Sequence, residues 1–107
     1  MAEEYQKIVN SFLGKIKDLR PQIGSIYLFG SHARGTARPD SDYDLLLVVP
    51  KKDMALKDKL YDAAMDVFME DEADISLKIV RKEDFDRMKK ISAPFLQNVL
   101  KEGIKVG

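Results

Sequence analysis

The chain has 107 residues, 45% of them hydrophobic, and its 18 Lys and Arg residues balance its 18 Asp and Glu residues. This balance gives no electrostatic reason to expect binding to long nucleic acid or to an anionic membrane. Because the chain has no cysteine and one histidine, it has neither disulfides nor a thiolate or histidine-rich metal site, and any metal ion would be bound by oxygen ligands.

No segment of the sequence has the features of a membrane span, a linker or an internal repeat. The apolar runs fall short of the roughly 20 residues that a membrane helix needs. The first residues, Met1-Ala2-Glu3-Glu4, are acidic, unlike a signal peptide. We therefore expect a single domain that comprises residues 1–107 and is located in the cytoplasm.

Helical spacing of apolar residues predicts the first element. Apolar side chains recur at intervals of three and four residues from Tyr5 to Leu19, and Pro21 is expected to end this helix. The following segment, residues 25–29, is a short apolar run and is expected to be a strand.

Two carboxylates stand at the head of a second predicted strand, residues 43–49. Gly30-Ser31 ends the first strand, ten residues intervene, and Asp42 and Asp44 follow. Because side chains alternate in a strand, both carboxylates project from one face, with Cα atoms about 7 Å apart. The apolar run behind them predicts a central strand, where two charges are costly unless a cation offsets them.

The chemistry of these residue types suits a phosphate and a metal ion. Mg²⁺ takes oxygen ligands and is typically held by one or two carboxylates together with substrate phosphates. Gly30 allows the backbone to approach a ligand closely, and Ser31 offers a hydroxyl at a position that could open a helix toward an anion. The pattern therefore predicts a phosphate-binding turn that faces a metal site.

The second half of the chain alternates helices and one strand. A long helix around residues 56–68 provides the crossover that a parallel strand pair requires. Alternating polar and apolar residues predict a half-buried strand over 75–80. A short helix with Phe85 and Met88 follows, and another begins after Pro94. We expect an α/β (α+β) domain with a small mixed β-sheet flanked by helices.

Gly30-Ser31, ten residues, then Asp42-x-Asp44 resembles the signature of the DNA polymerase beta-like nucleotidyltransferase superfamily, specifically its minimal nucleotidyltransferase (MNT) proteins. The resemblance covers nearly the whole chain. It implies the polymerase beta-like fold, ATP as substrate and two Mg²⁺ ions, for which Mn²⁺ can substitute. It also implies that the Gly-Ser turn holds nucleotide phosphates and that the two aspartates bind the metal ions.

The resemblance implies a third carboxylate on a later strand. Asp74 stands at the head of the predicted strand 75–80, on the same face as Ser76 and Lys78. We expect Asp74 to complete the catalytic and metal-binding set and to act on the incoming hydroxyl. Asp71 and Glu72 are the competing acids, and they are expected to lie in a solvated loop.

Several residues near the motif have two readings. Arg34 either neutralises triphosphate charge or is a solvated loop residue. Arg38 has the same two alternatives, but it is more remote from the motif, so the role of a solvated loop residue is favoured for it. Ser41 is a candidate nucleotide-binding residue, although its hydroxyl is better suited to fixing the turn through the backbone. His32 carries the single imidazole of the chain and could act as a general base, but the chemistry of the family uses carboxylates and metal ions instead, so this role is not favoured. Tyr43 is expected to pack away from the acids.

The resemblance also implies a partner. Pairs of an MNT protein and a HEPN-domain protein resemble toxin–antitoxin systems, in which the MNT protein attaches AMP to a tyrosine of the HEPN toxin. Because so small a domain leaves little room for an acceptor site of its own, we expect a partner or a second subunit to supply it, in a homo- or hetero-oligomer. Two alternatives remain open. The chain could be a catalytically weak binding module that neutralises a partner stoichiometrically, or a small-molecule adenylyltransferase of the aminoglycoside type.

Overall fold

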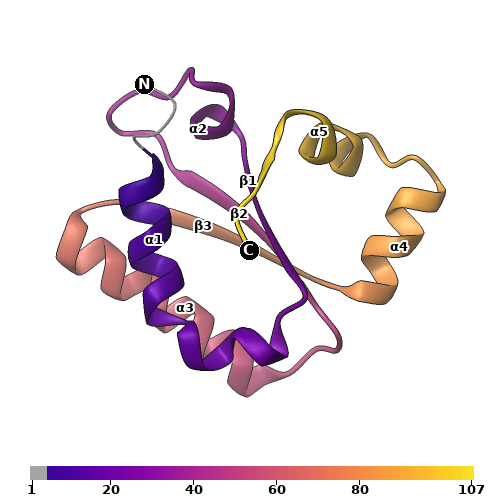
Figure 1. The fold of residues 1–107 in the computed structure, drawn as a ribbon, viewed down its shortest axis with the longest axis horizontal. Coiled ribbons are helices and arrows are strands. Elements are labelled where there is room, and N and C mark those ends of the chain that lie inside the picture. The colour runs from indigo at the N-terminus through magenta and orange to yellow at the C-terminus, as the bar shows by residue number, and fades with distance from the viewer. Residues whose placement is uncertain (1–4) are drawn as a thin grey trace.

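The computed structural model of the protein describes residues 5–107, so the acidic residues of segment 1–4 lie outside the described part. Four strands form one mixed sheet in the order β3-β2-β1-β4 (Figure 1). β1 is antiparallel to both β2 and β4, whereas β2 and β3 are parallel. The strands are β1 Ser25–Phe29, β2 Tyr43–Val49, β3 Ile75–Arg81 and β4 Ile104–Lys105.

Helices cover both faces of this sheet (Figure 1). α1 and α3 pack on one face, and α4 and α5 pack on the other. α2 is a short helix that immediately follows β1. The helices are α1 Tyr5–Lys15, the 3-10 helix η2 Lys17–Gln22, α2 Ser31–Arg34, α3 Met54–Asp71, α4 Lys82–Lys90 and α5 Pro94–Glu102.

β2 is the central strand, and its apolar run is buried on both faces. Residues 45–49 are each at most 2% exposed. Leu45 and Leu47 point into the core under α1 and α3, whereas Leu46 and Val48 point into the core under α4 and α5. The expectation of a central strand with both faces covered is therefore confirmed.

The first helix ends earlier than the sequence predicts. α1 stops at Lys15, and the chain continues as η2, which contains Pro21 near its end. The amide of Leu19 donates to the carbonyl of Ile16 at 2.8 Å, three residues back rather than four. Proline lacks an amide proton and its ring clashes with the carbonyl four residues earlier, so the tighter 3-10 turn accommodates what an α-helix would not.

The remaining elements differ from the prediction only at their ends and in one addition. β3 extends one residue beyond the predicted strand, to Arg81, and α3 is longer at both ends than the predicted helix. The two-residue strand β4 was not predicted, because so short a run has no periodicity. Within residues 5–107, no helix has both the length and the apolar character that crossing a membrane would require.

Gly103 and Gly14 form a matched pair for testing the packing of α5 against the sheet. A methyl group at Gly103 would overlap the carbonyl oxygen of Val99 and lie 2.9 Å from that of Leu28, whereas one at Gly14 would meet nothing within 4 Å. We expect Gly103→Ala to lower the free energy of unfolding by about 1–3 kcal/mol. Gly14→Ala should raise it by up to about 1 kcal/mol because glycine is a poor helix residue.

Urea denaturation of both variants checks this pair. Equal stabilities for the two variants would contradict the close approach of the α5–β4 turn to β1.

Candidate active site

Three separate segments of the chain meet at one edge of the sheet, the edge formed by the strand ends where β1 ends and β2 and β3 begin. In the antiparallel pair, Phe29 at the end of β1 lies opposite Asp44 near the start of β2. In the parallel pair, Asp44 lies beside Ser76 of β3, and the amide of Tyr43 donates to the carbonyl of Asp74 at 2.9 Å. The strand register therefore brings the Gly-Ser turn and the acids at positions 42, 44 and 74 to the same edge.

Gly30 is the tightest point of this edge. Its φ of 78° lies in the region that favours glycine, and a Cβ atom there would overlap Oδ2 of Asp44. The carbonyl of Gly30 accepts hydrogen bonds from the amides of Ala33 and Arg34 at 3.2 and 3.1 Å, so α2 begins at Ser31, a possibility that the sequence left open. Glycine is thus required both by the backbone conformation and by the neighbouring carboxylate.

Asp44 is half-buried, and its environment makes ionisation costly. Burial, followed by the negative charge of Asp42, raises the pKa of the Asp44 carboxyl above its ordinary value. Lys78, His32 and Arg34 act on that pKa in the opposite direction. The carboxylate therefore lies in an environment where added positive charge stabilises its ionised form.

Lys78 is the residue of this site that the sequence reasoning did not single out for a role. Leu46 is its partner in the β2–β3 register, two residues beyond the Asp44–Ser76 pair. The positive charge of Lys78 is the largest of the influences that lower the pKa of Asp44. The alternation of β3 does place Lys78 on the face of Asp74, but only the pairing register shows that this face is shared with Asp44.

The donor chemistry of the edge suits a hard divalent cation. Asp42 is exposed and precedes the first residue of β2, whereas Asp44 is half-buried and lies within β2. Asp74 is also exposed. Among residues 5–107, no three acidic, histidine or cysteine side chains are arranged so as to hold a metal ion. Two carboxylates suffice for Mg²⁺ when water and substrate phosphates complete its ligands, so the residues fit that ion.

His32 fastens the loop between α2 and β2. Its ring stacks on that of Tyr43, with centroids 3.7 Å apart and planes 9° from parallel. Its Nε2 donates to the carbonyl oxygen of Ser41 at 3.0 Å. These contacts give the single histidine a structural role and hold the start of β2 against α2.

Ser41 fixes the turn, as its residue type suggests. Its hydroxyl accepts a hydrogen bond from the amide of Arg38 at 2.9 Å, and its own amide donates to the Arg38 carbonyl at 3.0 Å. The side chain of Arg38 is exposed. A direct contact of Ser41 with nucleotide remains a prediction.

Beside the Gly-Ser turn lies a hollow of about 260 Å³ between α2 and α5. Arg34 and Glu102 form an ion pair at its rim, with 3.8 Å between Nη1 and Oε2. The ring of Phe95 packs edge-on against Phe29, with centroids 5.4 Å apart. The lining residues include Phe29, Gly30, Arg34, Phe95, Asn98 and Glu102.

One of the two competing acids is placed differently from the expected solvated loop, whereas Glu72 is exposed and lies in the segment between α3 and β3. Asp71 is the last residue of α3 and accepts a hydrogen bond from the hydroxyl of Ser11 at 2.9 Å. Glu72 caps the same helix in the left-handed conformation. The expectation of a loop is wrong for Asp71, because α3 continues further than the apolar spacing indicated.

Comparison with solved structures identifies the fold. A toxin–antitoxin complex crystallised with AMP-PNP contains a chain with a TM-score of 0.60 and 22% identity, covering 92% of this chain and 71% of that one. A complex of tri-AMPylated HEPN toxin from Shewanella oneidensis with MNT antitoxin contains a chain that matches with a TM-score of 0.55 and 19% identity. The match covers 95% of this chain and 71% of that one. A nucleotidyltransferase-like protein from Sulfolobus solfataricus matches with a TM-score of 0.56 and 22% identity, and the match covers 92% of this chain and 76% of that one.

Comparison with protein families extends this result to the sequence. No curated protein matches the chain. A family model described as the nucleotidyltransferase domain matches residues 9–106, a span that includes all four strands and the Gly30–Asp44 edge. The chain therefore belongs to the nucleotidyltransferase domain family, whose members are enzymes with this mixed-sheet fold.

Proposed function

We propose that the chain transfers AMP from ATP to a tyrosine hydroxyl of a HEPN-type toxin and thereby acts as its antitoxin. The observation that carries the proposal is the edge where Gly30 lies against the Asp44 carboxylate, next to Asp42 and the backbone of Asp74. Structures with the same fold support the choice of nucleotide and acceptor, since one contains AMP-PNP and another an AMPylated HEPN toxin.

In this proposal the phosphates lie along the Gly30-Ser31 turn. The close backbone at Gly30 and the Ser31 hydroxyl orient them, and Arg34 turns from Glu102 toward their negative charge. The nucleoside occupies the neighbouring hollow, where Phe95 offers an aromatic surface and Asn98 offers an amide. ATP is thus positioned with its α-phosphate facing Asp42 and Asp44.

Two Mg²⁺ ions, or Mn²⁺ in their place, would be held by Asp42 and Asp44 together with the substrate phosphates, and Asp74 would complete this set only in the presence of the bound ions and nucleotide. When bound, the ions would neutralise phosphate charge. The tyrosine oxygen forms a bond to the α-phosphorus, the bond from that phosphorus to the bridging oxygen of pyrophosphate breaks, and pyrophosphate leaves. Asp74 accepts the hydroxyl proton. Lys78 offsets the negative charge collected beside Asp44.

The first prediction concerns transfer. Asp42→Asn and Asp44→Asn should each abolish AMP transfer to a HEPN partner and leave the fold intact, because the amide no longer supplies an anionic oxygen. Asp74→Ala should remove the added adenylyl group from the partner as well. Intact-mass spectrometry of both proteins after incubation with ATP and Mg²⁺ measures the product.

Asp40→Asn is the matched control, since Asp40 is an exposed acid two residues from Asp42. It should leave transfer unchanged. Transfer retained in Asp44→Asn would contradict the site. Addition of AMP to an aminoglycoside, or ATP binding without any transfer, would replace the proposal by one of the two alternative functions.

The second prediction concerns pH. The folded-state pKa of Asp44 is raised, so the folded protein binds this proton more tightly than the unfolded chain does. The metal-free protein should therefore lose stability as pH rises from the ordinary carboxyl range through the raised pKa. Asp44→Asn should melt higher than wild type at neutral pH, and the difference should disappear at lower pH.

Differential scanning fluorimetry between acidic and neutral pH measures this effect. The same variant should lose the increase in Tm that saturating Mg²⁺ and ATP give the wild type by linkage. If metal-free Asp44→Asn melts below wild type at neutral pH, burial of this charge does not destabilise the protein and the assignment of its environment is wrong.

The third prediction concerns the nucleoside. Stacking of a base on an aromatic ring contributes roughly 1–3 kcal/mol, so Phe95→Ala should raise the Kd for ATP about tenfold or more. Leu100→Ala, at another exposed apolar position of α5, should not. Isothermal titration calorimetry with both variants distinguishes them, and equal affinities would place the nucleoside elsewhere.

A further inference from the structure

The outward face of α3 carries a stripe of exposed apolar side chains. Of the eight large apolar side chains that are exposed among residues 5–107, five lie on this one helix, each between 44% and 72% exposed. Four of them, from Tyr61 to Met69, lie on successive turns of one side next to the buried face, and Met54 lies on the same side two turns earlier. The stripe consists of Met54, Tyr61, Met65, Phe68 and Met69.

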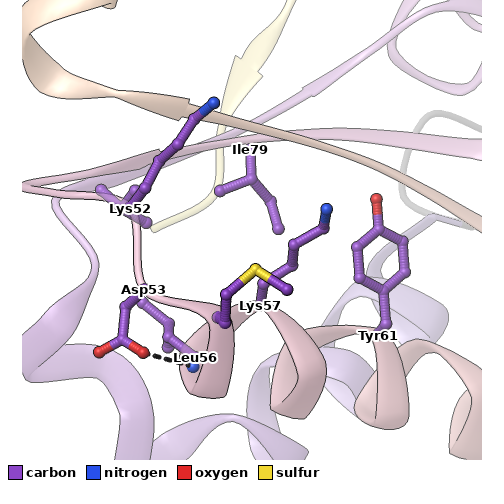
Figure 2. A pocket seen from close by; sticks show the side chains of 8 residues that line it. Lys52, Asp53, Leu56, Lys57, Tyr61 and Ile79 are labelled. Carbon is purple, nitrogen blue, oxygen red and sulfur yellow. Dashed lines mark hydrogen bonds between the residues drawn. The ribbon is translucent and has the colours of Figure 1, made fainter.

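At the N-terminal end of α3 the stripe leads into a pocket of about 310 Å³. Figure 2 shows Lys57 and Tyr61 rising from the helix toward Ile79 of β3, with Lys52 on the far side of the opening. Val49 and Leu56 also line the pocket. An apolar side chain of a bound partner would find here a recess lined largely by apolar atoms.

An acidic row borders the stripe on the side away from the sheet. Asp58, Asp62 and Asp66 follow one another at intervals of four residues. Among residues 5–107 none of them forms an ion pair, although Lys15, whose Nζ lies 2.6 Å from Oε2 of Glu70, also interacts electrostatically with Asp66. Like charges at this interval disfavour a helix, so basic side chains of a partner would stabilise this row.

We infer that this surface binds an amphipathic helix of a partner protein, with an apolar face bordered by Lys or Arg. Methionines make such a surface adaptable, and aromatic residues such as Tyr61 and Phe68 are typical anchors of interfaces. A second copy of this chain fits less well, because an antiparallel pair of α3 helices would place one acidic row against the other.

The position of the stripe relates it to the active-site edge. α3 ends at Asp71, three residues before Asp74, so the stripe runs from the pocket toward the end of the sheet where the acids meet. A helix bound along α3 would hold its protein beside that edge. This identification of the helix with the protein that receives AMP rests on the proposed function, but the binding itself does not.

Methyl NMR of the methionines tests the surface with an internal control. The probe is a synthetic helical peptide with leucines on one face and lysines on both flanks. Its addition should shift the signals of Met54, Met65 and Met69 and leave Met88 unchanged, because Met88 packs on the core beneath α4. The experiment is carried out without ATP, so binding is measured independently of AMP transfer.

Charge exchange makes the test specific. Replacing Asp58 and Asp62 together by lysine should weaken binding of the lysine peptide at least tenfold and permit binding of the same peptide with glutamates. Met65→Glu should also weaken binding, whereas Leu100→Glu, an exposed position on α5, should not.

The inference is overturned if the lysine peptide does not bind, if it shifts Met88 as strongly as Met65, or if charge exchange has no effect. It is also overturned if sedimentation shows a dimer of the chain that Met65→Glu dissociates, because the surface is then occupied by a second copy. If these results support the surface while no partner is AMPylated, the proposed function fails and the docking surface stands.

Discussion

The close approach of the Asp44 carboxylate to Gly30 is the constraint on which the candidate active site depends. It links the end of β1, the start of α2 and the head of β2 in one contact, because any side chain at position 30 would occupy the space of Asp44 Oδ2. The positive φ of Gly30 then turns the chain into α2. A motif that reads as two separate pairs of residues is therefore one packed unit.

This unit is stable because β2 is anchored elsewhere and the unfavourable charge is confined to its first residues. The apolar run behind Asp44 is covered by helices on both faces, whereas Asp42 and Asp74 remain exposed to solvent. Burial raises the pKa of the Asp44 carboxyl, and Lys78 partly offsets that effect. The fold thus keeps one half-buried carboxylate near two solvated ones, and a bound cation would offset the cost of the buried charge.

Local patterns predicted those parts of the structure that are determined by neighbours in sequence. β1 and β2 match their predicted ranges because turn residues bound both runs. The expectation that Asp42 and Asp44 share one strand face stays a prediction, because Asp42 precedes the first residue of β2. The end of α1 was misjudged because a proline permits a 3-10 turn, a choice that depends on packing rather than on spacing.

Features set by tertiary pairing could not be predicted in this way. The role of Lys78 follows from the β2–β3 register, and the stacking of His32 on Tyr43 follows from the path of the loop between α2 and β2. The ion pair of Arg34 with Glu102 joins the short helix α2 to the distant helix α5. Each of these contacts involves residues far apart in sequence, where periodicity carries no information.

The most direct test of the account is the location of the metal–nucleotide site. Mn²⁺ bound together with ATP broadens the NMR signals of nearby amides, and the account predicts strong broadening at Gly30, Asp44 and Ser76. Amides at the opposite end of the sheet, such as those of Lys52 and Arg81, should stay sharp. Broadening centred on Lys52, or spread evenly over the protein, would contradict the claim that the Gly30–Asp44 edge binds the nucleotide.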